Sequence, residues 1–261
     1  MNPVLARSYV AVTEQPGQPA SRMQLEMLEA RYRWAAAHAR GKDVLEAGCG
    51  TGIGLPMVAD VAWSVQAGDV DANNLRAAAE ACAGRCNIEL RAFHAENLPF
   101  ADESFDLLLL FEAIYYLADV GRFFKEARRV LRPGGILLIA TVNPAWTGFN
   151  PSPFRTRYLS AGDLLTELAA AGFTARVQGA FQEATGWMAG ATGMVRRAAV
   201  ALKLVPRTLR GKALLKRIFY GPLKPLPQRL AHGPGRSQVF SEMDCTAATT
   251  CRVLYVTAQK A

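Results

Sequence analysis

The sequence is poor in the residues that build metal sites, disulfide frameworks and membrane spans. Among 261 residues there are three histidines and five cysteines, and no two cysteines form a Cys-x-x-Cys pair. This scarcity argues against a zinc site and indicates reduced thiols in a cytoplasmic protein. We expect no transmembrane helix, because no run approaches the ~20 apolar residues that a span requires. We also expect no signal peptide, because no charged region followed by an apolar run opens the chain.

Acidic residues are missing from one long stretch near the C-terminal end. Between Glu183 and Glu242 there is no Asp or Glu, but there are eleven Lys or Arg. Because the whole chain is +8, the rest of it is −3 by subtraction. Apolar residues are interleaved with these charges, and prolines at 206 and from 222 to 227 interrupt them, which predicts two basic amphipathic helices.

Three interpretations of this basic stretch stay open. It could be a lid whose apolar faces pack on the rest of the chain, a surface that recognises an anionic substrate, or a surface that docks peripherally on the anionic inner face of a membrane. Nucleic acid is not an expected partner, because the basic residues are not combined with stacking aromatics or with a known binding module.

The most informative segment is residues 44–52, Val-Leu-Glu-Ala-Gly-Cys-Gly-Thr-Gly. An apolar strand ends near Glu46 and turns through three glycines into a helix, which lets the backbone approach a nucleotide-like ligand. The spacing is G-x-G-x-G, whereas dinucleotide-binding folds have G-x-G-x-x-G. An acid before the loop would repel a pyrophosphate but suits a cationic amine. A nicotinamide-dependent oxidoreductase is therefore disfavoured.

A second acidic site follows about twenty residues later. Residues 65–71, Val-Gln-Ala-Gly-Asp-Val-Asp, predict a strand that ends in an acid, where such folds hydrogen-bond a ribose diol. We expect Asp69 to bind the ribose and Asp71 to cap the following helix, although either acid could serve as the cap.

Together these segments resemble the class I S-adenosylmethionine-dependent methyltransferases. Residues 95–106, 107–111 and 129–139 are similar, in the same order, to the stretch before the family's fourth strand, to that strand, and to its fifth strand with the preceding turn. The resemblance covers residues 40–180 and is nearest to the broad small-molecule group that includes quinone and sterol methyltransferases. It implies S-adenosyl-L-methionine as the cofactor.

The resemblance also implies roles for individual residues. It places ten at the cofactor: Glu46, Gly48, Cys49, Gly50, Gly52, Asp69, Val70, His94, Ala95 and Glu96. Glu46 would lie near the methionine moiety, and Val70 would pack on the adenine. His94 stands where the family usually has an Asp that contacts the adenine amino group, so a backbone contact through Ala95 would replace it.

Residues after the fourth and fifth strands are candidates for the chemistry. Glu112, Tyr115 and Tyr116 could orient the acceptor or form its pocket, and the tyrosines could equally be packing residues. Four residues of the next loop are expected to bind the acceptor: Asn143, Trp146, Arg155 and Tyr158. Tyr9 could cover the cofactor. Arg31 could pair with the methionine carboxylate or be a solvated helix residue.

The expected fold is a doubly wound α/β sheet of seven mostly parallel strands. Strands are predicted at 43–47, 64–69, 88–93, 106–111, 135–141, 174–181 and 252–258, and helices at 21–39, 53–60, 72–83, 120–131 and 163–171. Residues 1–40 would form a helical cover. Residues 41–181 and 252–261 would form the cofactor-binding core, and 182–251 would form a basic helical insertion.

The expected function is methyl transfer from S-adenosylmethionine to an oxygen or nitrogen of a small molecule, without a metal. A sugar, or a phosphorylated, nucleotide-linked or lipid-linked metabolite, would give the basic stretch a purpose. Two alternatives are carbon methylation of a lipid-like or polyketide-like acceptor, and a partner protein that binds the cofactor without turnover. The sequence does not indicate the oligomeric state.

Overall fold

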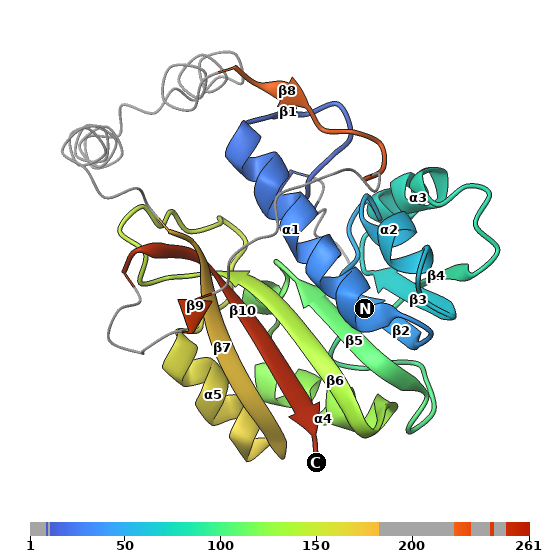
Figure 1. The fold of residues 1–261 in the computed structure, drawn as a ribbon, viewed down its shortest axis with the longest axis vertical. Coiled ribbons are helices and arrows are strands. Elements are labelled where there is room, and N and C mark those ends of the chain that lie inside the picture. The colour runs from blue at the N-terminus through green and yellow to red at the C-terminus, as the bar shows by residue number, and fades with distance from the viewer. Residues whose placement is uncertain (1–8, 10, 183–221, 231–240, 243–248) are drawn as a thin grey trace.

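A twisted sheet with helices on both faces forms the body of the protein (Figure 1). The computed structural model describes residues 9, 11–182, 222–230, 241–242 and 249–261. Along the sheet the order is β4-β3-β2-β5-β6-β10-β7-β9. The strands are β2 (Asp43–Ala47), β3 (Ser64–Asp69), β4 (Ile88–Ala92), β5 (Phe105–Phe111), β6 (Leu131–Val142), β7 (Phe173–Gln182), β9 (Ser241–Glu242) and β10 (Cys251–Lys260).

The direction of the strands matches the prediction. Strands β2 to β6 pair in parallel, and β10 runs antiparallel between β6 and β7. All seven predicted strands are confirmed, and the two-residue β9 adds an eighth at the edge. After β4 the chain returns to the other side of β2, so the strand order reverses between β2 and β5. Ligands of open α/β sheets bind at the carboxyl ends of the strands beside such a reversal.

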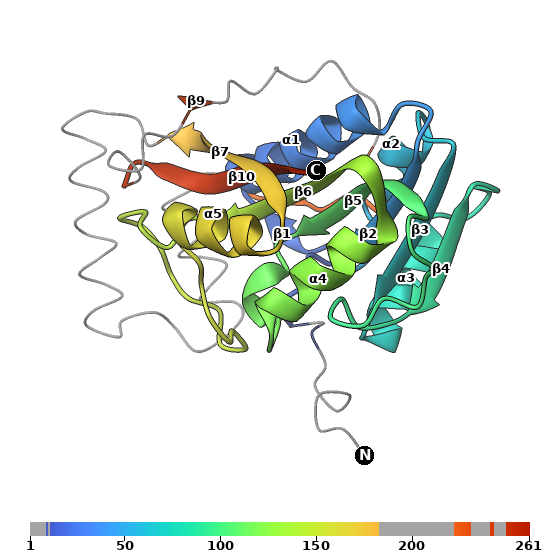
Figure 2. The ribbon, with the colours of Figure 1, turned by 90° about the horizontal axis from the view of Figure 1, so that it is seen from below.

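The sheet divides the apolar core into two layers, and helices cover each of them (Figure 2). Helices α1 (Arg22–Ala39) and α2 (Leu55–Ala59) cover one face, and α4 (Val120–Val130) and α5 (Ala161–Ala170) cover the other. Helix α3 (Ala72–Ala81) packs beside β3 and β4, and the short 3-10 helix η2 (Ile114–Tyr116) follows β5. In the described part of the chain, no helix is both long enough and apolar enough to cross a membrane.

Local side-chain chemistry explains where the helices begin. Ser21 caps α1, and its side chain and that of Gln24 form a reciprocal capping box. The start of α5 was predicted at Asp163, but the helix begins at Ala161 because Ser160 and Asp163 form a second capping box. Helix α2 is shorter than predicted because Ile53 and Gly54 belong to the preceding turn.

Strand β6 begins four residues earlier than predicted. Phe105 pairs with Leu131, but Leu107 pairs with Ile136, so the turn of residues 132–135 bulges out of the ladder. The sequence predicts this turn as a break between helix and strand. In the structure, pairing resumes on both sides of the bulge.

Part of the predicted insertion lies against the N-terminal cover. The clasp segment, defined as residues 222–230, contains β8 (Lys224–Pro225), which pairs antiparallel with β1 (Pro19–Ala20) (Figure 1). Gly17 N–H donates to the carbonyl of Leu226 (2.8 Å), and Leu230 N–H donates to the carbonyl of Ile53 (2.8 Å). Both leucine side chains are buried. The two predicted basic helices fall within residues 183–221, outside the described residues.

Gly54 has a packing role that the glycine spacing did not indicate. A Cβ at this position would lie 2.2 Å from the ring of Tyr32. We expect Gly54→Ala to lower the free energy of unfolding by about 1–3 kcal/mol, because the ring or the backbone must move. Urea denaturation measures this change.

A control for this substitution is Gly162→Ala in α5. The nearest atom to a Cβ there is Ser160 Oγ at 3.9 Å, so the change should be neutral or stabilising by about 0.5–1 kcal/mol. Equal stabilities for Gly54→Ala and the wild type would show that Tyr32 does not restrict this position.

Candidate active site

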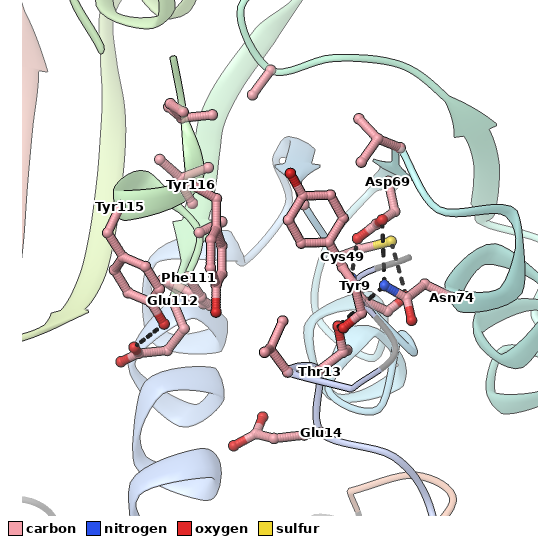
Figure 3. A pocket seen from close by; sticks show the side chains of 18 of the residues that line it. Tyr9, Thr13, Glu14, Cys49, Asp69, Asn74, Phe111, Glu112, Tyr115 and Tyr116 are labelled. Atoms are coloured by element: carbon pink, nitrogen blue, oxygen red, sulfur yellow. Dashed lines mark hydrogen bonds between the residues drawn. The ribbon is translucent and has the colours of Figure 1, made fainter. Parts of the chain in front are cut away.

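A cavity of about 520 Å³ opens at the carboxyl ends of β2, β3, β4 and β5 (Figure 3). Its walls come from the glycine loop after β2, the ends of β3 and β5, the turn after β4, helices α1 and η2, and the chain around residues 12–14. The volume is within the ordinary range for small-molecule and cofactor sites. Its place beside the reversal of strand order is where the fold predicts a ligand.

The glycine loop has a backbone conformation that only glycine adopts readily. Gly48, Gly50 and Gly52 have positive φ angles of 71°, 54° and 64°. Residues other than glycine rarely adopt such angles. Gly50 N–H donates to Asp69 Oδ2 (2.9 Å). A Cβ on Gly50 would lie 2.8 Å from the methyl group of Thr13, so the cover packs directly on the loop.

The two acids after β3 have different partners. Asp71 Oδ1 accepts from Asn73 N–H (2.9 Å), which confirms Asp71 as the cap of α3. Its Oδ2 accepts from Tyr9 N–H (2.8 Å). Asp69 lines the cavity instead, and its Oδ1 accepts from Asp71 N–H (2.8 Å). Burial raises the pKa of Asp69 although these hydrogen bonds oppose the rise. Its role at the ribose stays a prediction.

The cover segment, defined as Tyr9 and residues 11–20, closes one side of the cavity. Thr13 Oγ donates to the carbonyl of Tyr9 (2.9 Å) and accepts from Asn74 Nδ2 (3.2 Å). Thr51 Oγ of the glycine loop donates to the carbonyl of Glu14 (2.8 Å). Sequence reasoning missed Thr13, Thr51 and Asn74, because a polar residue in a loop or helix carries no signal of such long-range contacts.

Arg31 is a cavity residue and not a solvated one. Arg31 is 8% exposed, and its guanidinium pairs with the carboxylate of Glu14. Both side chains line the cavity. The alternative of a solvated helix residue is therefore wrong, and the pairing of Arg31 with a cofactor carboxylate stays a prediction.

Glu46 lies behind the cavity wall. It is fully buried, and its Oε1 accepts from the hydroxyl of Tyr32 (2.8 Å). Its Oε2 is buried with no hydrogen-bond partner among the described residues. Burial raises the pKa of Glu46 to about 8. Such an unpaired buried acceptor is uncommon in a folded protein, and the contact of Glu46 with a cationic amine stays a prediction.

The raised pKa of Glu46 has a consequence for stability. In the folded protein the carboxyl keeps its proton up to about pH 8, whereas in the unfolded chain it ionises near pH 4.5. Folding therefore takes up a proton between these values, and stability falls as pH rises through this window, by on the order of 1.4 kcal/mol per pH unit.

We expect Glu46→Gln to make the free energy of unfolding less dependent on pH between 5 and 8. The amide does not titrate, and its oxygen can still accept from Tyr32. Urea denaturation at four pH values measures the slope. Some slope should remain because Glu112 also titrates in this range. Identical slopes for variant and wild type would contradict the assignment to Glu46.

Glu112 and Tyr115 form a hydrogen-bonded pair on the opposite side of the cavity (Figure 3). The hydroxyl of Tyr115 donates to Glu112 Oε2 (3.0 Å). Burial raises the pKa of Glu112 to about 7, although Arg31 opposes the rise. Glu112 has a φ of 50°, an uncommon conformation for a residue other than glycine. Such backbone strain concentrates at functional sites.

Most predicted cofactor and catalytic residues line this one cavity. Those that do are Gly48, Cys49, Gly50, Asp69, Val70, His94, Ala95, Glu96, Glu112, Tyr115 and Tyr116. Glu46 and Gly52 lie behind it. Gly52 packs on α3, where a Cβ would lie 2.8 Å from the Ala78 side chain. The chemical role of each residue stays a prediction.

The four predicted acceptor residues do not line the cavity. Asn143 Nδ2 donates to the carbonyl of Cys251 (2.9 Å), which joins the end of β6 to β10. The Trp146 ring lies 4.7 Å below the guanidinium of Arg252, and Arg155 is exposed. Tyr158 packs behind Tyr115 with ring centroids 4.8 Å apart. Thr156 is the member of this loop that reaches the cavity.

Comparison with known proteins finds relatives for part of the chain. Residues 45–139 match the family model described as a methyltransferase domain. A "probable S-adenosylmethionine-dependent methyltransferase" of Mycolicibacterium smegmatis is 38% identical over 151 residues, which are 56% of this chain and 57% of that protein. A ubiquinone biosynthesis O-methyltransferase of Rhizobium etli is 36% identical over 104 residues, covering 40% and 42%. The chain thus spans about half the length of the curated relatives it matches.

Solved structures share the fold. The [4+2]-cyclase SpnF superposes with a TM-score of 0.59 and 22% identity, covering 95% of this chain and 85% of that one. The YcgJ protein of Bacillus subtilis gives a TM-score of 0.57 and 16% identity, covering 90% and 98%. At these identities the likeness shows the fold alone.

The Rossmann-like fold, the glycine loop and the match of residues 45–139 together indicate a methyltransferase domain. Residues 45–139 match a methyltransferase domain, and relatives of this stretch are named as probable S-adenosylmethionine-dependent methyltransferases.

Proposed function

We propose that this protein transfers the methyl group of S-adenosylmethionine to a hydroxyl oxygen or a nitrogen of a small-molecule acceptor. One observation carries the proposal. Glu112, a carboxyl group whose pKa is near neutrality, faces the same cavity as Asp69 and the glycine loop. A positioned base with such a pKa can take a proton from the acceptor as the new bond forms.

The cofactor would occupy the side of the cavity formed by β2, β3 and β4. Asp69 would bind the ribose hydroxyls, and the backbone of Gly48 and Gly50 would approach the methionine portion. Val70, His94 and Ala95 would surround the adenine. When bound, the cofactor supplies an electrophilic methyl group on a positively charged sulfur. The protein's own task is then to orient the acceptor, exclude water and hold the proton.

Arg31 would contribute to this binding through its charge. Its guanidinium pairs with Glu14, which is part of the cover segment. A carboxylate brought by the cofactor would share Arg31 with Glu14. Binding of the cofactor would therefore weaken or rearrange the ion pair that holds the cover segment at Glu14.

An oxygen acceptor is supported by one relative's name, that of the ubiquinone biosynthesis O-methyltransferase. Another relative, the phthiotriol/phenolphthiotriol dimycocerosates methyltransferase 1 of Mycobacterium ulcerans, is 40% identical over 119 residues, 44% of this chain and 43% of that protein. The prediction of a sugar or phosphorylated acceptor depends on the basic stretch, most of which lies outside the described residues.

The basic insertion is proposed to act as a lid. Support comes from the clasp segment, which joins the cover through β1 and β8 and reaches the glycine-loop region through Leu230. Peripheral docking of the insertion on an anionic membrane surface is an alternative. Flotation with anionic vesicles would separate the two, because a lid alone gives no binding to the vesicles.

The test is turnover. Purified protein is incubated with S-adenosylmethionine and a panel of hydroxyl, amine and activated-carbon acceptors, and S-adenosylhomocysteine and methylated products are measured by mass spectrometry. The proposal expects O-methyl or N-methyl products. Carbon-methylated products would favour the C-methyltransferase alternative. Tight binding of the cofactor without turnover on any acceptor would indicate a non-catalytic partner protein.

A further inference from the structure

The cavity has two chemically different sides (Figure 3). One side is polar and consists of the glycine loop, Asp69 and Asn74. Tyr115 and Tyr116 lie on the other side beside Glu112, and Tyr9, which lies next to Cys49 and Asp69, packs on Tyr116. The three rings of Tyr9, Tyr115 and Tyr116 are called here the aromatic wall. Because the proposed function assigns the polar side to the cofactor, the aromatic wall is left to the acceptor.

The aromatic wall is a packed cluster of rings. The ring centroids of Tyr115 and Tyr116 are 4.5 Å apart, and those of Tyr9 and Tyr116 are 5.5 Å apart, both in edge-on geometry. Phe154 supports Tyr9 from outside at 6.3 Å, and Tyr158 supports Tyr115. Edge-to-face packing of this kind fixes the rings and favours a further ring against them.

Hydroxyl groups of the wall are already engaged. Tyr115 donates to Glu112, and the hydroxyl of Tyr116 shares a hydrogen bond with Ser152 Oγ (2.9 Å). These two tyrosines therefore offer ring surface more than hydrogen bonds. A sugar presents several hydroxyl groups, and each one buried against such a wall without a partner would cost binding energy.

Charge on the cavity lining disfavours an anionic group at the transfer point. Carboxylates of Glu14, Asp69 and Glu112 line the cavity. Arg31, the cation that acts on Glu112, is already paired with Glu14. A phosphate beside Glu112 would therefore meet more carboxylate charge than the one guanidinium offsets. The acceptor group that reaches Glu112 should be neutral.

The acidity of the acceptor decides between kinds of hydroxyl. Burial raises the pKa of Glu112 to about 7. A phenol loses its proton near pKa ~10, as tyrosine does. The difference between this pKa and that of Glu112 is small. An aliphatic hydroxyl has a pKa closer to that of water, at about 16. This pKa is too far above that of Glu112 for a carboxylate to remove the proton efficiently.

We propose that the acceptor is a phenol whose ring packs on the aromatic wall formed by Tyr9, Tyr115 and Tyr116, with its hydroxyl directed to Glu112. The proposal rests on the proposed function and names its substrate class. In the step, the phenolic oxygen forms a bond to the methyl carbon while the sulfur–carbon bond breaks and the sulfur keeps that electron pair. The phenolic proton passes to the carboxylate of Glu112.

Isomeric probes test the proposal. 4-Ethylphenol and 4-methylbenzyl alcohol have the same formula and the same ring but differ in hydroxyl acidity. With 4-octylphenol, 4-phenylphenol and methyl β-D-glucoside they form a panel for methyl transfer from labelled S-adenosylmethionine. We expect at least one phenol to be methylated with kcat/KM more than about 100-fold above those of the benzyl alcohol and the glucoside.

Outcomes of this panel separate the two proposals. If the glucoside or the benzyl alcohol is methylated as fast as the phenols, the proposal of a phenol acceptor is wrong. The proposed function would still hold. Binding of S-adenosylhomocysteine without methylation of any phenol would also overturn the phenol. Failure to bind S-adenosylhomocysteine would overturn the proposed function itself.

Variants of the wall give a second test. We expect Tyr116→Leu to raise the KM for the phenol about threefold to tenfold, the size of an aromatic pair contact, with a much smaller effect on kcat. Tyr116→Phe keeps the ring, so its KM should stay close to that of the wild type. Tyr9→Leu, in the cover segment, should act like Tyr116→Leu. Equal KM values for the Leu and Phe variants at position 116 would show that the ring does not contact the acceptor.

Discussion

Replacing Glu112 by Gln is expected to lower kcat by about 100-fold to 10,000-fold, the usual contribution of a general base. The amide is nearly the same shape and can still accept from Tyr115, but it cannot take a proton. Binding of S-adenosylhomocysteine should change by less than about threefold. Steady-state kinetics and calorimetric titration measure the two quantities.

The pH profile makes this prediction specific. Because the pKa of Glu112 is raised to about 7, the base is ionised only above that value. The kcat of the wild type should therefore rise with pH and reach a plateau above about 7, and Glu112→Gln should lose this acid limb. Tyr115→Phe, which removes the hydrogen bond to Glu112, should keep the limb at a shifted position. An unchanged limb in Glu112→Gln would assign it to another group.

Asp69→Asn is expected to weaken cofactor binding by 100-fold or more. Asp69 accepts from the N–H groups of Gly50 and Asp71 with its two oxygens. An amide must place an NH₂ group against one of these donors, so the glycine loop shifts and a buried donor loses its partner. The same change removes a carboxylate from the cavity wall. Calorimetric titration with S-adenosylhomocysteine measures the affinity.

The matched control lies two residues away. Asp71 is not part of the cavity wall, and Asp71→Asn keeps an oxygen for the cap of α3 while its NH₂ group replaces the acceptor of Tyr9 N–H. It should alter stability and leave the affinity within about threefold. Equal losses of affinity in the two variants would mean that the turn as a whole, and not the Asp69 carboxylate, determines binding.

The seven long strands and the five α-helices could be predicted closely because each of them had a local signal. Buried parallel strands appear as apolar runs, and the strand that begins at Asp43 ends at the glycine loop as expected. Ser21 and Asp71 are N-caps, and they indicated where their helices begin. The bulge at residues 132–135 was missed because it depends on how β5 and β6 pair across the sheet, which local patterns do not encode.

The site could be predicted where residues follow a strand directly. Asp69 and Glu112 end or follow β3 and β5, so topology alone brings them to one cavity. The loop after β6 was harder, because its direction depends on tertiary contacts. Asn143 ties that loop to β10, and consequently Thr156 reaches the cavity whereas Arg155 stays exposed.

Neighbours across the chain account for the remaining differences. Arg31 lies on a helix with mixed polarity, and its burial depends on Glu14, seventeen residues earlier. Tyr32 occupies the space above Gly54 and also binds Glu46. These contacts join α1 to the glycine loop. They explain why the N-terminal helix is part of the site and not only a cover over it.

Calorimetric titration of the wild-type protein with S-adenosylhomocysteine and, separately, with NADH tests the central claim most directly. We expect S-adenosylhomocysteine to bind at one site per chain and NADH not to bind. Binding of NADH without binding of S-adenosylhomocysteine would contradict the assignment of the glycine loop and Asp69, together with the function built on them.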